Sequence, residues 1–223
     1  MQKRKIIIGT YDTALEGLWT LTAWNLARAE AVEEYANIPG HGPLDLSTAL
    51  TDGEPYYGSR EFEATFESSE GNRLEREERI NQMINKLDGL RFNITLPDDS
   101  LHYISGRVRV ERLYNDLAHA SVRVSATCDP WRYNNAETVV GVTAASTTKT
   151  VSLINNGRLS VIPKTKIAGG TVTLKATING RASTWTRGDG TYNFVDLYIK
   201  PGSTAITYSG TGTVTFTYRE AVL

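Results

Sequence analysis

Apolar and polar side chains alternate along most of the chain, which is the pattern of β-strands that bury one face. In REFEATFES, residues 60–68, two phenylalanines and an alanine alternate with three glutamates and a threonine. A half-buried strand with an acidic outer face is therefore expected there. Further strands are predicted in the first part of the chain at 6–11, 18–24, 91–104, where a hairpin turns at Pro97-Asp98-Asp99, and 120–128.

One segment has the period of a helix instead. Its apolar stripe, at positions i, i+3, i+4 and i+7, consists of Ile80, Met83, Ile84 and Leu87. Asn72 can cap this helix and Glu75 can complete a capping box, while Gly89 supplies a stop after the last turn. We predict a helix over 73–87, with its Glu- and Arg-rich first half in solvent.

Residues 27–36, ARAEAVEEYA, leave two possibilities open. Their alanines and glutamates favour a helix, whereas their position between predicted strands favours an extended link. Nothing else in the local sequence decides between the two.

The second part of the chain is rich in threonine, glycine and β-branched residues and has no helical stripe. Short predicted strands recur every 8–12 residues with turns such as INNGR and KPGST between them, a spacing typical of an all-β sandwich of two sheets. These strands are predicted at 138–144, 149–154, 159–167, 171–178, 182–187, 193–199, 205–209 and 213–219.

The two parts meet where Asp129-Pro130 is expected to end a strand, because proline cannot donate to a central ladder. We therefore predict two domains, 1–132 and 133–223. The expected fold class is α+β and mainly β, with a β-rich first domain that contains one α-helix and an antiparallel β-sandwich as the second.

Composition supports a folded protein, since 40% of the residues are hydrophobic and 22% are charged. The net charge of −1 conceals an asymmetry. Residues 1–130 contain 14 Lys+Arg and 21 Asp+Glu, whereas residues 131–223 contain 10 and 4, so the two parts carry −7 and +6. Neither part is basic enough to predict tight nucleic-acid binding.

Export and anchoring signals are not expected. The single cysteine, Cys128, excludes an internal disulfide framework and suits a reducing cytosol. The apolar run of three isoleucines near the amino terminus is too short for a signal-peptide core or a membrane span, so no membrane anchor is expected.

The candidate catalytic and metal-binding residues fit no known pattern. His41, His102 and His119 lack metal-ligand spacing, and Cys128 is not accompanied by a nucleophile motif. Three glutamates alternate along one strand, which predicts a solvated or subunit-facing row rather than a glycosidase pair. We therefore expect no enzyme activity, no metal, no cofactor and no small-molecule ligand.

Aromatic residues in the second part allow an alternative function. Trp185 and Tyr192, together with Tyr198, could present a stacking platform for sugars. A carbohydrate-binding, lectin-like module that recognises host cell-wall polysaccharide is therefore kept as the second hypothesis, although aromatic residues in sandwiches more often belong to the core.

Residues 37–46, NIPGHGPLDL, form a stiff turn. Glycines permit positive φ angles and prolines fix the direction of the chain. Ile38, Leu44 and Leu46 are expected to hold the loop down. A loop constrained in this way holds a shape that another copy of the protein can fit against.

The order of motifs around this loop resembles the amino-terminal signature of siphophage distal tail proteins, the Dit family. The motifs are Ile38-Pro39-Gly40, Gly42, Leu44-Asp45-Leu46-Ser47, Leu50-Thr51-Asp52-Gly53, Tyr57 and Arg60, followed by Asp88-Gly89, Asp98-Asp99, Tyr103, Gly106-Arg107, Asp129-Pro130-Trp131, Asn155-Asn156-Gly157 and Pro163. The resemblance covers nearly the whole chain.

This resemblance implies a structural hub in the virion, at the distal end of a phage or prophage tail, made and assembled in the cytoplasm of the bacterial host. The first domain would form a homo-hexameric ring that continues the tail tube, and the second, galectin-like sandwich would hold baseplate or receptor-binding proteins. The implied partners are further copies of the chain, the tail tube protein, and tail-associated and receptor-binding proteins, with DNA only as passing cargo.

The surfaces for ring contacts are predicted from the loop, the acidic strand 61–67 and the hairpin 91–104. The candidate interface residues are Ile38, Pro39, Gly40, Gly42, Leu44, Asp45, Leu46, Tyr57, Arg60, Glu61 and Glu63. An acidic first domain would also suit a channel along which DNA slides without adhering, because anionic walls repel phosphate.

Overall fold

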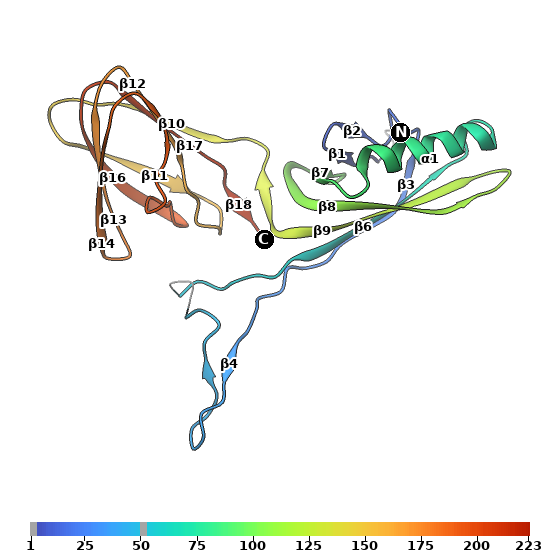
Figure 1. The fold of residues 1–223 in the computed structure, drawn as a ribbon, viewed down its shortest axis with the longest axis horizontal. Coiled ribbons are helices and arrows are strands. Elements are labelled where there is room, and N and C mark those ends of the chain that lie inside the picture. Colours follow the sequence, from blue (N-terminus) through green and yellow to red (C-terminus); the bar gives the residue numbers. More distant parts are fainter. Residues whose placement is uncertain (1–3, 50–52) are drawn as a thin grey trace. The chain divides into compact units, whose positions relative to one another are not determined.

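The computed structural model describes residues 4–49 and 53–223, and the chain forms two compact units, one ending at Arg132 and the other beginning at Tyr133 (Figure 1). The first unit is an antiparallel β-sheet with one helix, and the second is a β-sandwich. The expected fold class, α+β and mainly β, is confirmed.

The sheet of the first unit has the strand order β2-β1-β7-β8-β9-β6-β3. Its strands are β1 (Ile7–Ile8), β2 (Tyr11–Asp12), β3 (Thr20–Leu26), β6 (Arg60–Ser68), β7 (Arg91–Leu96), β8 (Asp99–Asn115) and β9 (Ala120–Asn134). Residues of β6 alternate between buried and more exposed as the sequence predicts, and β6 lies between β9 and the edge strand β3.

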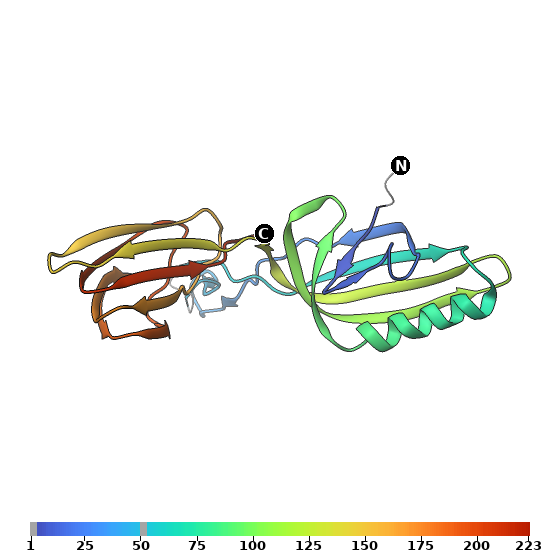
Figure 2. The same ribbon diagram turned by 90° about the horizontal axis from the view of Figure 1, so that it is seen from above.

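Helix α1 (Arg73–Leu87) covers one face of this sheet (Figure 2). Its buried residues Ile80, Met83 and Leu87 join the core cluster formed by inward side chains of the sheet. The predicted capping box is present, since Asn72 Oδ1 accepts hydrogen bonds from the amides of Leu74 and Glu75 at 2.9 and 3.0 Å. The predicted bounds of the helix are confirmed.

One residue of the first helical turns departs from the expectation of a solvated face. Arg76 is buried, and its guanidinium donates to the carbonyl oxygens of Gly71, Asp116 and Leu117. These bonds tie the turn between β8 and β9 to the start of α1.

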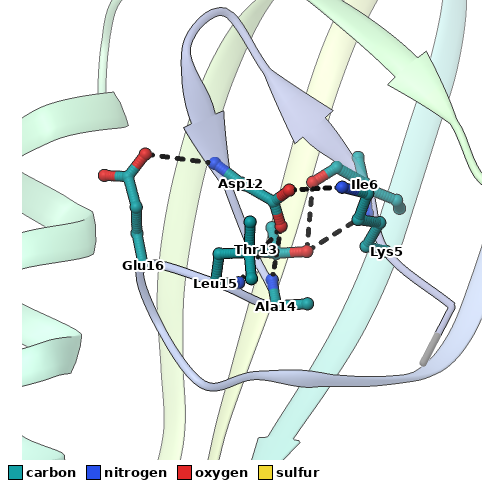
Figure 3. A network of polar contacts seen from close by, with 7 residues as sticks. All are labelled: Lys5, Ile6, Asp12, Thr13, Ala14, Leu15 and Glu16. Atoms are coloured by element: carbon teal, nitrogen blue, oxygen red, sulfur yellow. Dashed lines mark hydrogen bonds and ion pairs between the residues drawn. The ribbon is translucent and has the colours of Figure 1, made fainter. Parts of the chain in front are cut away.

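The amino-terminal segment is a tight hairpin rather than the single strand predicted over 6–11. Gly9 adopts φ +61° between β1 and β2, a conformation that favours glycine. Polar side chains fix the loop that follows (Figure 3): Thr13 Oγ1 donates to the carbonyl of Ile6, and Asp12 accepts from the amide of Ala14 while pairing with Lys5 at 2.6 Å.

The second unit consists of two four-stranded antiparallel sheets, with strand orders β10-β17-β12-β15 and β11-β16-β13-β14. The strands are β10 (Thr138–Thr143), β11 (Lys149–Asn155), β12 (Lys164–Ala168), β13 (Val172–Ile178), β14 (Arg181–Arg187), β15 (Gly190–Asn193), β16 (Gly202–Gly210) and β17 (Thr213–Tyr218). Their inward side chains form a second core cluster that shares no residue with the first.

The carboxy-terminal residues bind the first residues of the second unit. Arg219 pairs with Glu137 at 3.1 Å, and the amide of Asn134 donates to the carbonyl of Glu220 at 3.0 Å. The short strand β18 (Ala221–Val222) follows directly after these contacts.

Two further sequence-based expectations about strands are wrong. Strand β9 continues through Asp129-Pro130 to Asn134, because its pairing with β6 ends at Cys128 and Pro130 is not required to donate to that neighbour. The strand predicted over 193–199 lies earlier in the chain, because β15 ends at Asn193. After it, the amide of Leu197 donates to the carbonyl of Phe194 and the chain turns.

Candidate functional site: an exposed arm and its base

The stretch between β3 and β6 forms a two-stranded hairpin, and we call its described residues, 27–49 and 53–59, the arm (Figure 1). Residues 27–36 are extended within it, which decides the alternative left open by the sequence. Backbone hydrogen bonds join its two sides from Ala27–Glu61 through Glu30–Gly58 and Val32–Tyr56 to Glu34–Leu46. The short strands β4 (Tyr35–Ala36) and β5 (Leu44–Asp45) pair below the tip.

Apolar side chains of the arm are exposed because the arm has no core of its own. The exposed fractions are 44% for Val32, 54% for Tyr35, 42% for Ile38, 48% for Leu44 and 60% for Tyr56. The expectation that Ile38 and Leu44 hold the loop down is therefore wrong, and only Leu46 of the three is half-buried. Exposed apolar groups gathered on one projecting segment indicate a surface that another molecule covers.

The tip of the arm contains the glycines and prolines that the sequence singled out. Gly40 has φ +81°, so glycine is favoured there, and the amide of His41 donates to the carbonyl of Ile38 at 3.0 Å. Pro39 and Gly42 are exposed beside them. The motif residues Leu50, Thr51 and Asp52 lie outside the described residues.

The acidic excess of the first unit is concentrated in this segment. Residues 27–59 contain six acidic residues and a single arginine, whereas the remainder of 1–132 contains 15 acidic and 14 basic residues. Within the described chain, Glu30, Glu33, Glu34 and Asp45 form no ion pair. The charges of Glu33 and Asp45 raise the pKa of Tyr35.

The base of the arm brings together residues that are distant in the sequence. The rings of Tyr57 and Trp131 contact each other in a T-shaped arrangement at a centroid distance of 5.5 Å. Arg60, the first residue of β6, is only 6% exposed, and neither Nε nor Nη2 of its guanidinium meets a hydrogen-bond partner in the part of the chain that the structure describes. Burial and the neighbouring charge of Arg132 lower the pKa of Arg60.

Beside Arg60 lies a group of three ion-paired side chains centred on Asp99. Asp99 accepts from Arg132 at 3.2 Å and contacts His102 Nδ1 at 2.7 Å. Burial would raise the pKa of Asp99, but the hydrogen bond from His102 and the charges of His102 and Arg132 hold it below its ordinary value.

The acidic row of β6 lies on the sheet face opposite the core. Glu61 and Glu63 are exposed, but both have partners: Glu61 accepts from Thr127 at 3.0 Å and Glu63 pairs with Arg123 at 3.2 Å. Arg123 also reaches Glu111 at 3.5 Å. This face is therefore partly neutralised, which the sequence pattern of β6 alone could not show.

The two candidate sugar-stacking residues point into the sandwich. Trp185 and Tyr192 are half-buried, and their rings pack against Phe194 at 5.3 and 5.6 Å. The hydroxyl of Tyr192 also donates to the carbonyl of Gly188 at 3.1 Å. A groove of about 680 Å³ crosses β13, β14 and β16, and neither ring lines it. Their packing is that of core residues.

Residues 4–49 and 53–223 contain no group of three acidic, histidine or cysteine side chains that could hold a metal, and no helix there is long and apolar enough to cross a membrane. Burial raises the pKa of Cys128 to about 12, so its sulfur is a thiol at neutral pH and not a nucleophilic thiolate.

The two units together define a β-rich fold in which an α+β sheet unit precedes a β-sandwich. A solved structure with this fold is the Dit (gp 19.1) protein of SPP1, described as a paradigm of the hub adsorption apparatus in phages that infect Gram-positive bacteria. The two share 14% sequence identity with a TM-score of 0.69, over 98% of this chain and 99% of the other. The Dit-like resemblance is therefore confirmed at the level of the fold.

The other two comparisons give no match. No protein-family model matches the chain, and a search of curated proteins also finds none that matches.

Sequence reasoning identified the tip of the arm but missed its exposed sides and the buried charge at its base. Val32, Tyr35 and Tyr56 carry much of the exposed apolar surface. A signal for them existed, because aromatic and aliphatic residues are interspersed there with glutamates without a helical or strand period.

Proposed function

We propose that this chain is the structural hub of a phage or prophage tail tip. In this proposal six copies form a ring, which joins the tail tube protein to the baseplate and receptor-binding proteins at the distal end of the tail. The shared fold with the SPP1 Dit protein over almost the whole of both chains supports this role. The proposed role is structural and not enzymatic.

The observation that carries the proposal is the exposed arm. A cyclic ring needs two different complementary surfaces on each protomer, one that reaches out and one that receives. The arm supplies the first: it exposes Val32, Tyr35, Ile38, Leu44 and Tyr56 and packs none of them into a core of its own. Burial of these side chains against a neighbour would contribute about 25 cal/mol per Å² of apolar area removed from water.

The candidate interface residues divide between two parts of this surface. The tip and outer arm contain Ile38, Pro39, Gly40, Gly42, Leu44, Asp45 and Leu46, while Tyr57, Arg60, Glu61 and Glu63 lie at or beside the base. We assign the first group to the reaching surface. Tyr57 and Arg60 belong to the receiving surface.

The two units are assigned different tasks. The first unit, 1–132, builds the ring and continues the tail tube, and the sandwich, 133–223, holds the other tail-tip proteins. The face of β6 that carries Glu61 and Glu63 is the candidate wall of the central channel, since carboxylates repel DNA phosphate and allow DNA to pass as cargo. Assembly would take place in the cytoplasm of the bacterial host.

Ring formation is tested with the full chain by sedimentation velocity and negative-stain microscopy. The wild type is expected to form six-fold rings as its concentration rises. The double variant Ile38→Ser/Leu44→Ser is expected to assemble at least tenfold more weakly because it removes exposed apolar surface from the arm. The matched control Val195→Ser/Ile154→Ser changes apolar residues of the sandwich that are even more exposed, and it should assemble as the wild type does.

Two results would contradict the proposal. One is a wild type that stays monomeric at high concentration and also fails to assemble with the tail tube protein. The other is equal loss of assembly in the arm variant and the sandwich control, because the arm would then have no specific role.

A further inference from the structure

Arg60 presents an unsatisfied positive charge at the base of the arm. It alternates with Phe62 and Phe66 along β6, so its side chain lies on the core side of the sheet. The residue is 6% exposed, and among the described residues none accepts a hydrogen bond from its Nε or Nη2. A buried guanidinium without a counter-charge costs several kcal/mol.

The neighbours of Arg60 do not supply that counter-charge. Cys128, its partner in the ladder between β6 and β9, remains a neutral thiol because burial raises its pKa to about 12. Arg132 is a like charge. The carboxylate of Asp99 is already shared between Arg132 and His102.

The two unsatisfied atoms specify the kind of ligand. Nε–H and Nη2–H lie side by side along one edge of the planar guanidinium, and this edge binds the two oxygens of a carboxylate in a bidentate pair. A missing bidentate acceptor is therefore the simplest description of the site. The arm offers candidates for this acceptor, since Glu30, Glu33, Glu34 and Asp45 form no ion pair in the described chain.

The arm of the same protomer cannot satisfy Arg60 with its outer carboxylates. The arm is already paired at its base, where the amide of Gly58 donates to the carbonyl of Glu30. Glu34 is four extended residues farther out and pairs with Leu46, so it lies about 13 Å beyond Glu30 at roughly 3.3 Å per residue. A carboxylate from the outer arm must therefore come from another copy.

We propose that Arg60 is the receptor for a carboxylate on the outer arm of the neighbouring protomer, and that its side chain turns toward the surface to complete a bidentate ion pair when the ring forms. This inference rests on the ring proposed above and names the contact that fixes its register. Among the outer acids, Glu34 is the first candidate, since its carboxylate meets no partner within the described chain, whereas Glu33 and Asp45 accept from Tyr35 and Ser47.

The first test separates the protomer from the ring. Arg60→Met removes the buried charge and keeps an apolar stem of similar length, so the thermal midpoint of the protomer is expected to stay unchanged or rise. The ring dissociation constant, measured by sedimentation velocity, is expected to increase at least tenfold. Arg60→Lys keeps the charge but cannot form a bidentate pair. Its ring dissociation constant should therefore lie between those of the wild type and Arg60→Met.

The second test identifies the acid by double-mutant cycles. Glu33→Gln, Glu34→Gln and Asp45→Asn are each measured alone and combined with Arg60→Met. The residue that pairs with Arg60 is the one whose effect on assembly disappears in the Arg60→Met background. Glu30→Gln is the control, and its effect is expected to be the same in both backgrounds.

Several outcomes overturn the inference. The inference is refuted, and the hub proposal left intact, if the wild type forms rings and Arg60→Met assembles equally tightly. The same holds if the effects of Arg60→Met and of each acid substitution on assembly are additive in all three cycles. A lowered midpoint of the Arg60→Met protomer would show that Arg60 serves the fold of the single chain. Stabilisation by inorganic phosphate that depends on Arg60 but not on the arm would assign the site to a free anion. Failure of the wild type to form rings would remove the hub proposal itself.

Discussion

Two leucines on the same helix allow the packing of the first unit to be measured with a matched pair of substitutions. Leu87 is 1% exposed and belongs to the core cluster beneath α1, whereas Leu74 in the first turn is 81% exposed. Leu87→Ala should lower the free energy of unfolding of the first unit by about 3 kcal/mol, because it removes buried methyl groups and leaves a cavity. Leu74→Ala should change it by less than about 0.5 kcal/mol.

Urea unfolding followed by tryptophan fluorescence reports each unit separately. Trp19, Trp24 and Trp131 lie in the first unit and Trp185 is the only tryptophan of the second, so the Trp185→Phe background reports the first unit alone. With a slope of about 2 kcal/mol per molar urea, a loss of 3 kcal/mol moves the midpoint of the first unit by about 1.5 M. The midpoint of the second unit, followed through Trp185 in a variant with the other three tryptophans replaced by phenylalanine, should not move.

Separate unfolding of the two units is expected because their cores share no residue. Equal shifts of both transitions by Leu87→Ala would refute it, because the units would then unfold as one. Equal effects of Leu87→Ala and Leu74→Ala would refute the placement of the helix on the sheet.

Three further predictions follow from individual side chains. Cys128, with a pKa of about 12 and a buried sulfur, should resist alkylation by iodoacetamide at pH 8 in the folded protein and react in urea, and equal rates in the two states would contradict this. The pKa values of Asp12 and Asp99 are lowered in the folded state, so both contribute stability that is present above about pH 4 and lost as the pH falls below it; Asp99→Asn should therefore show a smaller drop in thermal midpoint between pH 5 and pH 3 than the wild type. Trp185→Ala should destabilise the sandwich by about 2–3 kcal/mol in chemical denaturation and leave ring assembly unchanged, because its ring packs on Phe194; loss of cell-wall polysaccharide binding without loss of stability would instead favour the lectin hypothesis.

Local sequence was sufficient for elements whose signals are local. The helix was predicted to the residue because Asn72 and Glu75 act within one turn of its start and Gly89 acts directly after its end. Strand β6 was equally clear, since alternation over nine residues fixes which side chains face the core. The sandwich followed from the regular spacing of turns.

The arm could not be predicted in the same way because pairing between distant residues determines it. Alanine and glutamate in 27–36 favour a helix locally, and the extended form is fixed by partners up to 34 residues away, as in the bond between Ala27 and Glu61. The partners of Glu61 and Glu63 could not be predicted from the alternation along β6 either, because both partners lie on β9. Arg60 occupied a buried position in that pattern, but only the structure shows that no acid of the described chain accompanies it.

The concentration of negative charge on the arm also matters before any neighbour is found. A projecting hairpin with exposed aromatic and aliphatic residues can pair edge to edge with its own kind and grow into fibrils. Glu30, Glu33, Glu34 and Asp45 make two such hairpins repel each other, while the rest of the first unit, with 15 acidic and 14 basic residues, is nearly neutral and remains open to approach. Repulsion between the acidic arms therefore opposes aggregation of newly made chains through arm-to-arm pairing.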